Sequence, residues 1–390
     1  MESSAEPGSS GDAGTVRVAV DGLLEVLSGA RISSDTSGVG NAGTVDIAAG
    51  ALRLDRAGAE QFTGLSSDAY SGSSGAAGAV RVTVADLLEV RNGAAIRSST
   101  WTVGDAGTVT MRAGSARLLD GGYIHSRAET GSSGAGGNVT LEIAGLLDVL
   151  NRARIDVSGN GGGSIAVDAD DALLTNYSVL ASNNSGPTDA ANGVDLHIRN
   201  MLEISGGTWI SSNSNFESTG RAGDVEVEAG NMRLDGSGAG LRTWLMSNSK
   251  YSGDAGTVSV KVEGLFEIIA GGWISSNALD TGNAGKVEIK SGEMRIDGRG
   301  FSNWLTGVTS NTDCSRCPSN GINGGNAGAI KITVVGMIEL LNGAQINSST
   351  WATGNAGNLE IKAGSMYLDA QGFSRWFTGL ASTAEPELSV

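Results

Sequence analysis

Short runs in which apolar and polar residues alternate recur along the chain, and residues 325–357 show the arrangement most clearly. Three such runs lie there, at 330–334, 337–340 and 344–348. Alternation over four or five residues predicts a β-strand with one buried face. Turns are predicted between the runs, at Val335-Gly336 and Asn342-Gly343, and Gly-Asn-Ala-Gly both opens and closes the stretch. Three strands, three corners and a return to the same tetrapeptide predict one coil of a β-solenoid.

The same unit repeats along the whole chain. Its Gly-x-Ala-Gly motif (the mark of each unit), or a degenerate form of it, most often recurs after 29 or 30 residues. Alternate units differ in amino-acid sequence and in length. The marks end at Gly14, Gly43, Gly78, Gly107, Gly137, Gly163, Gly193, Gly223, Gly256, Gly285, Gly328 and Gly357. We therefore predict an all-β protein, a right-handed parallel β-helix of about twelve three-stranded coils of two alternating types, as a single repeat domain over residues 1–390.

A column of outward side chains follows from aligning the second strand of every unit. In chain order it reads Glu25, Arg53, Glu89, Arg117, Asp148, Leu173, Glu203, Arg233, Glu267, Arg295, Glu339 and Tyr367. Acid and base alternate with two exceptions. Strands in neighbouring coils lie roughly 4.8 Å apart, so opposite charges on one face can pair. The alternation predicts that one unit forms one coil.

The inward positions of the same strands are mostly apolar and are predicted to form a continuous narrow core. The third strand also points a small polar residue inward. In the odd-numbered units these residues are Ser34, Ser98, Ser212, Ser276 and Ser348. We expect their hydroxyls to bond along the stack or to the backbone.

Charge and hydropathy narrow the classes of partner. The net charge is −16, from 42 acidic and 26 basic residues. This balance disfavours nucleic acid and anionic membranes as partners. No apolar run reaches the roughly 18 residues of a membrane span, so no membrane insertion is expected. Residues 1–4 lack the basic start and apolar core of a secretion signal, and the two ends share one phase of the repeat, so we interpret the chain as a fragment of a longer array.

These motifs resemble a known family. The chain is similar to the repeat region of filamentous haemagglutinin-like exoproteins. The resemblance lies in the Gly-Asn/Asp-Ala-Gly marks, the strand sequence that follows them, the LxLxxGAxISSxT pattern, and the FTGL or WLTGL sequence of the even units. The resemblance covers nearly the whole chain, and its motifs are structural. It implies a right-handed parallel β-helix, export of the full-length protein through an outer-membrane transporter of a two-partner secretion system, a secreted or bacterial cell-surface location, and adhesion to surfaces or to other cells.

Two cysteines lie in the longest insertion of an even unit, residues 309–327. Cys314 and Cys317 form a CxxC pair without a second CxxC, and the two histidines, His125 and His197, lie many coils away. A local disulfide or free thiols are favoured, with half of a zinc site and a redox pair as the alternatives.

Asp168, Asp170 and Asp171 form the densest acidic cluster. We interpret it as an outward strand position followed by a solvated turn, with a calcium site or a pair of glycosidase carboxylates as alternatives. Neither histidine has a nucleophile and an acid nearby in the repeat. No catalytic residue, metal site or cofactor is therefore predicted.

Tryptophans of the last even units form the remaining candidate site. Trp244, Trp304 and Trp376 are predicted to occupy matching places, with Phe301 and Phe373 beside two of them. They either fill the wider even coils or form an exposed strip that stacks on sugar rings. Trp101 and Trp351, which follow the third strand of odd units, would extend such a strip.

The sequence favours a structural and adhesive segment that is not an enzyme and that binds host, cell or glycan surfaces. The alternative is a β-helical enzyme that processes polysaccharides, a glycosidase or a lyase. Ice binding would need an uninterrupted threonine array, and the column that contains Thr15, Thr44 and Thr108 is broken by Ala79 and Asn138.

Overall fold

The computed structural model describes residues 1–189, 193–215, 218–238, 242–300, 305–313, 324–351, 353–371 and 377–384. All regular elements in these ranges are strands. None of the described residues forms a helix long and apolar enough to cross a membrane. Contacts divide the chain into two compact units, residues 1–173 with 177–182 and residues 174–176 with 183–390.

The first unit contains β1 Thr15–Leu27, β2 Arg31–Ser33, β3 Thr44–Asp55, β4 Gly64–Ser66, β5 Ala79–Val84, β6 Leu87–Arg91, β7 Ala95–Arg97, β8 Thr108–Ala113, β9 Ser115–Leu119, β10 Tyr123–His125, β11 Asn138–Leu150, β12 Arg154–Asp156, most of β13 Ser164–Thr175, and β14 Val179–Ala181. The second unit contains β15 Val194–Ser205, β16 Trp209–Ser211, β17 Val225–Asp235, β18 Thr243–Met246, β19 Val258–Ile269, β20 Gly272–Ser275, β21 Val287–Asp297, β22 Thr306–Thr309, β23 Ile330–Val334, β24 Met337–Leu341, β25 Ala344–Asn347, β26 Leu359–Lys362, β27 Ser365–Asp369 and β28 Gly379–Ala381.

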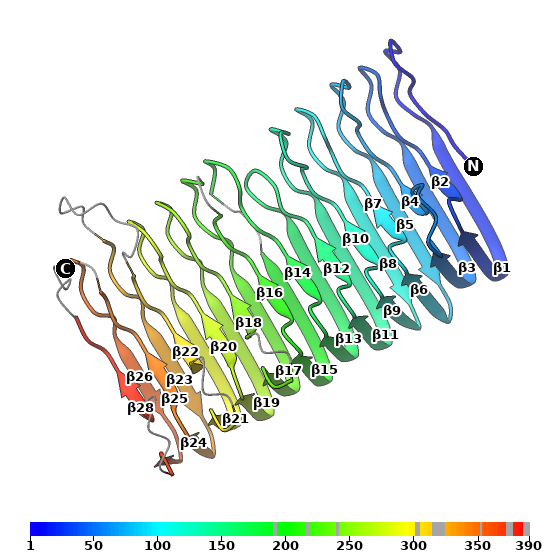
Figure 1. Ribbon diagram of the computed structural model, residues 1–390. Helices are drawn as coiled ribbons and strands as arrows, with labels where there is room; N and C mark the ends of the chain where they lie inside the picture. Colours follow the sequence, from blue (N-terminus) through cyan, green and yellow to red (C-terminus); the bar gives the residue numbers. More distant parts are fainter. Residues whose placement is uncertain are drawn as a thin grey trace. The chain divides into compact units, whose positions relative to one another are not determined.

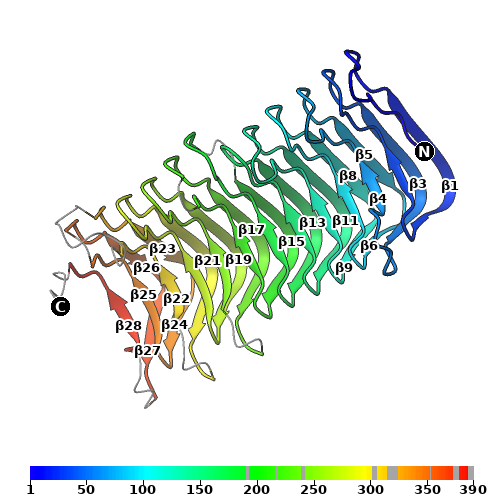
Figure 2. The ribbon, with the colours of Figure 1, turned by 45° about the horizontal axis from the view of Figure 1, so that its top comes forward.

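Each unit is a stack of coils in which strands pair in parallel with the equivalent strands of the next coil. Long strands form one layer, and short strands such as β4, β7 and β10 form a second layer against it (Figures 1 and 2). Each unit has six short strands, one per coil, and the chain makes about 11 turns from the first short strand to the last. The predicted all-β solenoid is confirmed, and its parallel coils are consistent with a right-handed β-helix.

The first corner of the coil differs from the prediction. A turn was expected between the first and second strands, but in eight coils the two runs form one continuous long strand, for example β1 and β19. The pairing register shifts at this point, between Val20 and Leu23 in β1 and between Val262 and Leu265 in β19. A bulge of this kind bends the strand without ending its hydrogen bonding.

The core lies between the two layers and is built by equivalent residues that stack from coil to coil. In the third coil Val80, Leu88 and Ile96 come from three successive strands, and each is completely buried. Their neighbours in the stack are again aliphatic, as at Val109 and Ile124. Because each coil buries its apolar face only against its neighbours, stability arises from stacking rather than from any one coil.

The inward serines join the third strand to the marked glycine of the same coil. In ten coils the serine Oγ donates a hydrogen bond of 2.5–2.7 Å to that glycine's carbonyl oxygen. These serines are Ser34, Ser67, Ser98, Ser126, Ser182, Ser247, Ser276, Ser310, Ser348 and Ser382. Ser67, Ser98 and Ser126 also lie 3.2 Å from the serine carbonyl of the preceding coil. The predicted bonding to backbone and along the stack is thus present.

Candidate functional site

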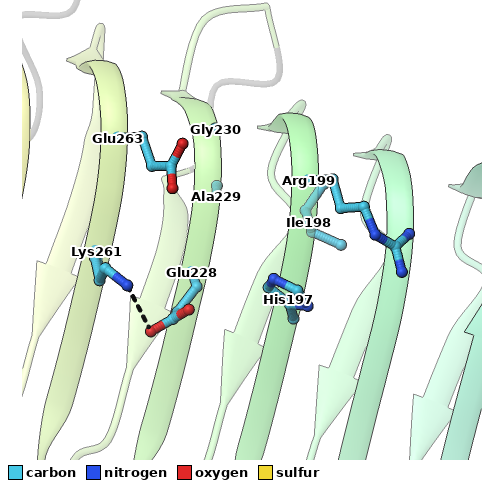
Figure 3. Close-up of a pocket in the computed structure, with 8 residues that line it drawn as sticks. All are labelled: His197, Ile198, Arg199, Glu228, Ala229, Gly230, Lys261 and Glu263. Atoms are coloured by element: carbon cyan, nitrogen blue, oxygen red, sulfur yellow. Dashed lines mark hydrogen bonds and ion pairs between the residues drawn. The ribbon is translucent and has the colours of Figure 1, made fainter.

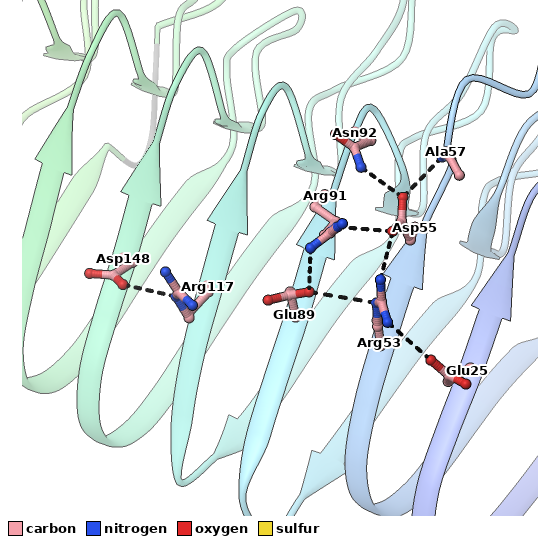
Figure 4. Close-up of polar contacts among 9 residues, drawn as sticks. All are labelled: Glu25, Arg53, Asp55, Ala57, Glu89, Arg91, Asn92, Arg117 and Asp148. Atoms are coloured by element: carbon pink, nitrogen blue, oxygen red, sulfur yellow. Dashed lines mark hydrogen bonds and ion pairs between the residues drawn. The ribbon is translucent and has the colours of Figure 1, made fainter.

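The outward column of charges has the predicted register. Glu25 pairs in the sheet with Arg53, Arg53 with Glu89, and Glu89 with Arg117, each in the next coil. Figure 4 shows the side chains on one outer face of the first unit. Arg53 lies 3.3 Å from Glu25 and 3.7 Å from Glu89. The one-unit, one-coil prediction is confirmed.

The same column continues within the second unit. Glu203, Arg233, Glu267, Arg295 and Glu339 are successive register partners. The sheet pairing is unbroken, and Arg233 lies 3.5 Å from Glu267. The charges therefore specify which strand pairs with which.

An aspartate at the end of the second strand in four of the six even coils completes this network, and the sequence reasoning missed it. Arg53 Nη2 donates to the Asp55 carboxylate at 3.0 Å, and Arg91 and Asn92 of the next coil donate to the same carboxylate at 2.9 and 2.8 Å. The Asp55 carboxylate also accepts from the Ala57 N–H, at the turn that follows (Figure 4). Burial raises the pKa of Asp55, but these hydrogen bonds outweigh burial and hold the pKa below its usual value. The network is structural, because the guanidinium, carboxamide and backbone N–H groups around Asp55 bind its carboxylate and tie neighbouring coils together.

A buried acidic cluster lies on the outer side of the short strands in the first unit. Asp35 and Asp68 come from neighbouring coils and are 3% and 0% exposed. Arg97 lies 2.5 Å from the Asp68 carboxylate and 4.0 Å over the ring of Phe62. Burial raises the pKa of Asp68 to about 7, although Arg97 opposes the shift. A carboxyl group with a raised pKa beside a second carboxyl group is the pattern of a glycosidase acid–base pair. Both carboxyl groups are buried here, so a substrate cannot reach them.

His125 lies two coils away from Asp68 in the same layer, beside Asp156. Burial lowers the pKa of His125, and Arg127 and Arg154 add to this effect, while Asp156 opposes it. Its Nε2 atom is buried and has no hydrogen-bond partner among the described residues. The ring lies 4.4 Å from that of Tyr123. Among the described residues no hydroxyl is hydrogen-bonded to the His125 ring, so its environment is that of a packed, neutral histidine.

His197 lies on the long-strand layer of the second unit, where it lines a cavity of about 320 Å³ with Arg199, Glu228, Lys261 and Glu263. Figure 3 shows these side chains on the outer side of three adjacent long strands. Lys261 and Glu228, from neighbouring coils, lie 3.2 Å apart. Among the described lining residues there is no Phe, Tyr or Trp. The site continues the pattern of charges that pair between coils.

The acidic cluster of the sixth coil lies within a strand. Asp168, Asp170 and Asp171 all belong to β13, so the predicted turn at the last two is wrong, for the same reason as at the other first corners. Over the described residues, no three His, Cys, Asp or Glu side chains are grouped as metal ligands. Cys314 and Cys317 lie outside the described residues, and so do Trp304 and Trp376.

Trp244 lies in β18, and its position corrects the alignment of the even coils. It pairs in register with Trp273, and Trp273 pairs with Gly307, so Gly307 and not Trp304 is the equivalent of Trp244. The preceding threonine fixes this register. Thr243 Oγ1 accepts a hydrogen bond from a glycine N–H of the preceding coil at 3.1 Å, and Thr306 Oγ1 does so at 2.8 Å.

Tryptophans also form a column that was not predicted. Trp209, Trp244 and Trp273 are register partners in three successive short strands, β16, β18 and β20. The rings of Trp244 and Trp273 meet edge to face at 5.9 Å, and the Arg242 guanidinium lies 3.8 Å over the ring of Trp273. A comparison of the third-strand text would have shown this column, because a tryptophan directly precedes Ile-Ser-Ser in two of the three coils.

Beyond Trp273 this face opens into a groove in the second unit. The groove has a volume of about 490 Å³. Its aromatic lining residues are Trp273, Trp351 and Phe377, and most of its polar ones carry carboxamides or hydroxyls. Trp351 was predicted to extend an aromatic strip, whereas the rest of this lining was not predicted. The groove can bind a ligand through ring faces and amides, and Asp313 is the single ionisable residue of its described lining.

Comparisons with known proteins do not assign the chain to a family. No family model matches the chain, and searches of curated proteins and of solved structures likewise found no match.

Proposed function

We propose that the chain is a structural and adhesive repeat segment of a secreted or cell-surface exoprotein of the filamentous haemagglutinin-like type. In this proposal it binds host, cell or glycan surfaces, and an outer-membrane transporter exports the full-length protein. The observation that carries the proposal is how the side chains are used. Charged residues of the outward columns pair with neighbouring coils, whereas the groove of the second unit presents aromatic rings and carboxamides.

This distribution suits binding better than catalysis. A hydrolase or lyase needs carboxylates or a base that substrate can reach. The carboxylates with the clearest acid–base pattern, Asp35 and Asp68, are covered. Aromatic rings and carboxamides bind without reacting, and together they are typical of recognition surfaces.

Retention on surfaces tests the proposal. The labelled chain would be applied to intact cells and to a panel of immobilised neutral and acidic polysaccharides, with bare matrix and double-stranded DNA as controls. We expect retention on at least one cell or glycan surface that persists at high salt, because ring stacking is not screened as ion pairs are. Absence of retention on every surface, or retention on DNA alone, would refute the adhesive role.

A further inference from the structure

The groove of the second unit is formed by four successive coils. Trp273 comes from the first of these coils, Asn311 from the second, Gln345 and Trp351 from the third, and Phe377 from the fourth. Three coil spacings of roughly 4.8 Å make it about 14 Å long. It therefore has the length of a short linear ligand rather than of a single small molecule.

The gap at the centre of the groove follows from a backbone requirement. Gly307 lies between Trp273 and Gln345 in the register of the short strands. Its φ angle is +144°, and a Cβ atom there would overlap the carbonyl oxygen of Gln345. Only glycine fits this conformation, so the column of large side chains is interrupted at this coil.

Polar groups beside the gap are fixed in place by the stack. The Oδ1 atoms of Asn277 and Asn311 each accept a backbone N–H of the next coil at 2.8 Å, from Asn311 and Ser349. Over the described residues, neither side-chain amide nitrogen donates to a protein acceptor, although both side chains are more than nine-tenths buried. Gln345 donates through Nε2 to the Phe377 carbonyl at 3.0 Å, which leaves its Oε1 as an acceptor. The groove thus offers preorganised donors and an acceptor, as a ligand rich in hydroxyls requires.

The aromatic rings supply apolar surface at the two ends of this polar centre. Trp351 is 38% exposed and Phe377 is 50% exposed. The Trp273 indole N–H donates to Thr309 Oγ1 at 2.9 Å, which holds the plane of its ring. Fixed rings beside amides suit a ligand that has apolar C–H faces and polar edges.

Charge selects among such ligands. Asp313 is the only ionisable residue among the described lining residues, and the chain as a whole carries a charge of −16. The other polar side chains of the described lining are uncharged carboxamides and hydroxyls, which match the hydroxyls of a neutral sugar. We infer that the groove binds a short linear stretch of an uncharged glycan, an inference that deepens the adhesive function proposed above and rests on it.

Calorimetry on the whole chain with defined oligosaccharides tests the inference. The neutral probes are β-1,4-linked hexasaccharides of glucose and of mannose, and the charged probe is a hexasaccharide of β-linked uronic acids. Groove variants are Trp351→Ala and Gln345→Leu. The matched control is Trp101→Ala, because Trp101 follows the same Ser-Ser-Thr text in the first unit.

We expect at least one neutral probe to bind, the uronate probe not to bind, and Kd to rise about tenfold in Trp351→Ala and about fivefold in Gln345→Leu. Trp101→Ala should change Kd less than about twofold. Uronate binding as tight as neutral binding, or groove variants that bind like the parent, would overturn the assignment. Surface retention without binding of any neutral hexasaccharide would also overturn it while leaving the adhesive function intact. Hexasaccharide binding in the groove without retention on any surface would overturn the adhesive function and leave the groove assignment intact.

Discussion

Replacement of a marked glycine tests the link between the sequence repeat and the coil. At Gly107 an added Cβ would overlap the carbonyl oxygen of Gly78 in the preceding coil and the Oγ of Ser98. Both obstacles are fixed by the stack and cannot move alone. Gly107→Ala must therefore push two coils apart.

The magnitude follows from the hydrogen bonds at this point. Gly107 N–H donates to Ser98 O at 3.0 Å, Thr108 N–H donates to Gly78 O at 3.0 Å, and the Ser98 and Ser126 hydroxyls donate to Gly78 O and Gly107 O at 2.7 and 2.6 Å. At about 0.5–1.5 kcal/mol for each of the four bonds, Gly107→Ala should lower the free energy of unfolding by about 2–6 kcal/mol.

Amide hydrogen exchange is the suitable assay, because coils of a solenoid can open locally without unfolding the rest. We expect protection to fall in β7, β8 and β10. The control is Gly22→Ala, since Gly22 has no atom within 4 Å of an added Cβ and its φ angle is not positive. Unchanged protection in Gly107→Ala, or an equal loss in Gly22→Ala, would show that the marks do not act through close approach of the coils.

Three further changes have defined outcomes. Arg53→Met removes three ion pairs and should lower the free energy of unfolding by about 2 kcal/mol. Arg117→Met removes one ion pair, to the buried Asp148, and should lower it by about 1 kcal/mol. Equal losses in a denaturant titration would contradict the network. Because the folded pKa of His125 is depressed, the unfolded chain alone takes up a proton below about pH 6.5, so stability falls as the pH drops from 7 to 5 by up to about 2 kcal/mol. His125→Gln should flatten this dependence, as melting temperatures of the variant and of the parent at each pH would show. Serine at both cysteines should leave circular dichroism and melting nearly unchanged, since the pair lies in an insertion; a loss above about 2 kcal/mol would mean a structural disulfide.

The register of the coils could be predicted from the sequence, because equivalent residues of successive coils lie next to each other in a parallel stack and recur at the same place in each repeat. Glu25, Arg53 and Glu89 align as expected. The aspartate at the end of the second strand, such as Asp55, was missed because the column was read only between coils. Residues i and i+2 of one strand share a face, so the pairing of Arg53 with Asp55 was in principle readable.

The groove was harder to predict, because its position depends on where the third strand begins. Variable loop lengths obscured this point, and Trp244 was aligned with Trp304 instead of with Gly307. The threonine that opens the short strand, Thr243 in β18 and Thr306 in β22, is the signal that resolves the alignment. The groove itself joins residues from four coils around a missing side chain, and a local sequence pattern does not reveal such a gap.

Exposure of the chain to a polysaccharide that retains it, followed by measurement of the ends of the sugar chains, tests the central claim most directly. The claim is that this solenoid recognises surfaces by binding alone. We predict stoichiometric retention and, over a long incubation, no increase in reducing ends and no unsaturated ends. Progressive release of reducing ends would identify a glycosidase, and unsaturated ends would identify a lyase; either result would contradict the account.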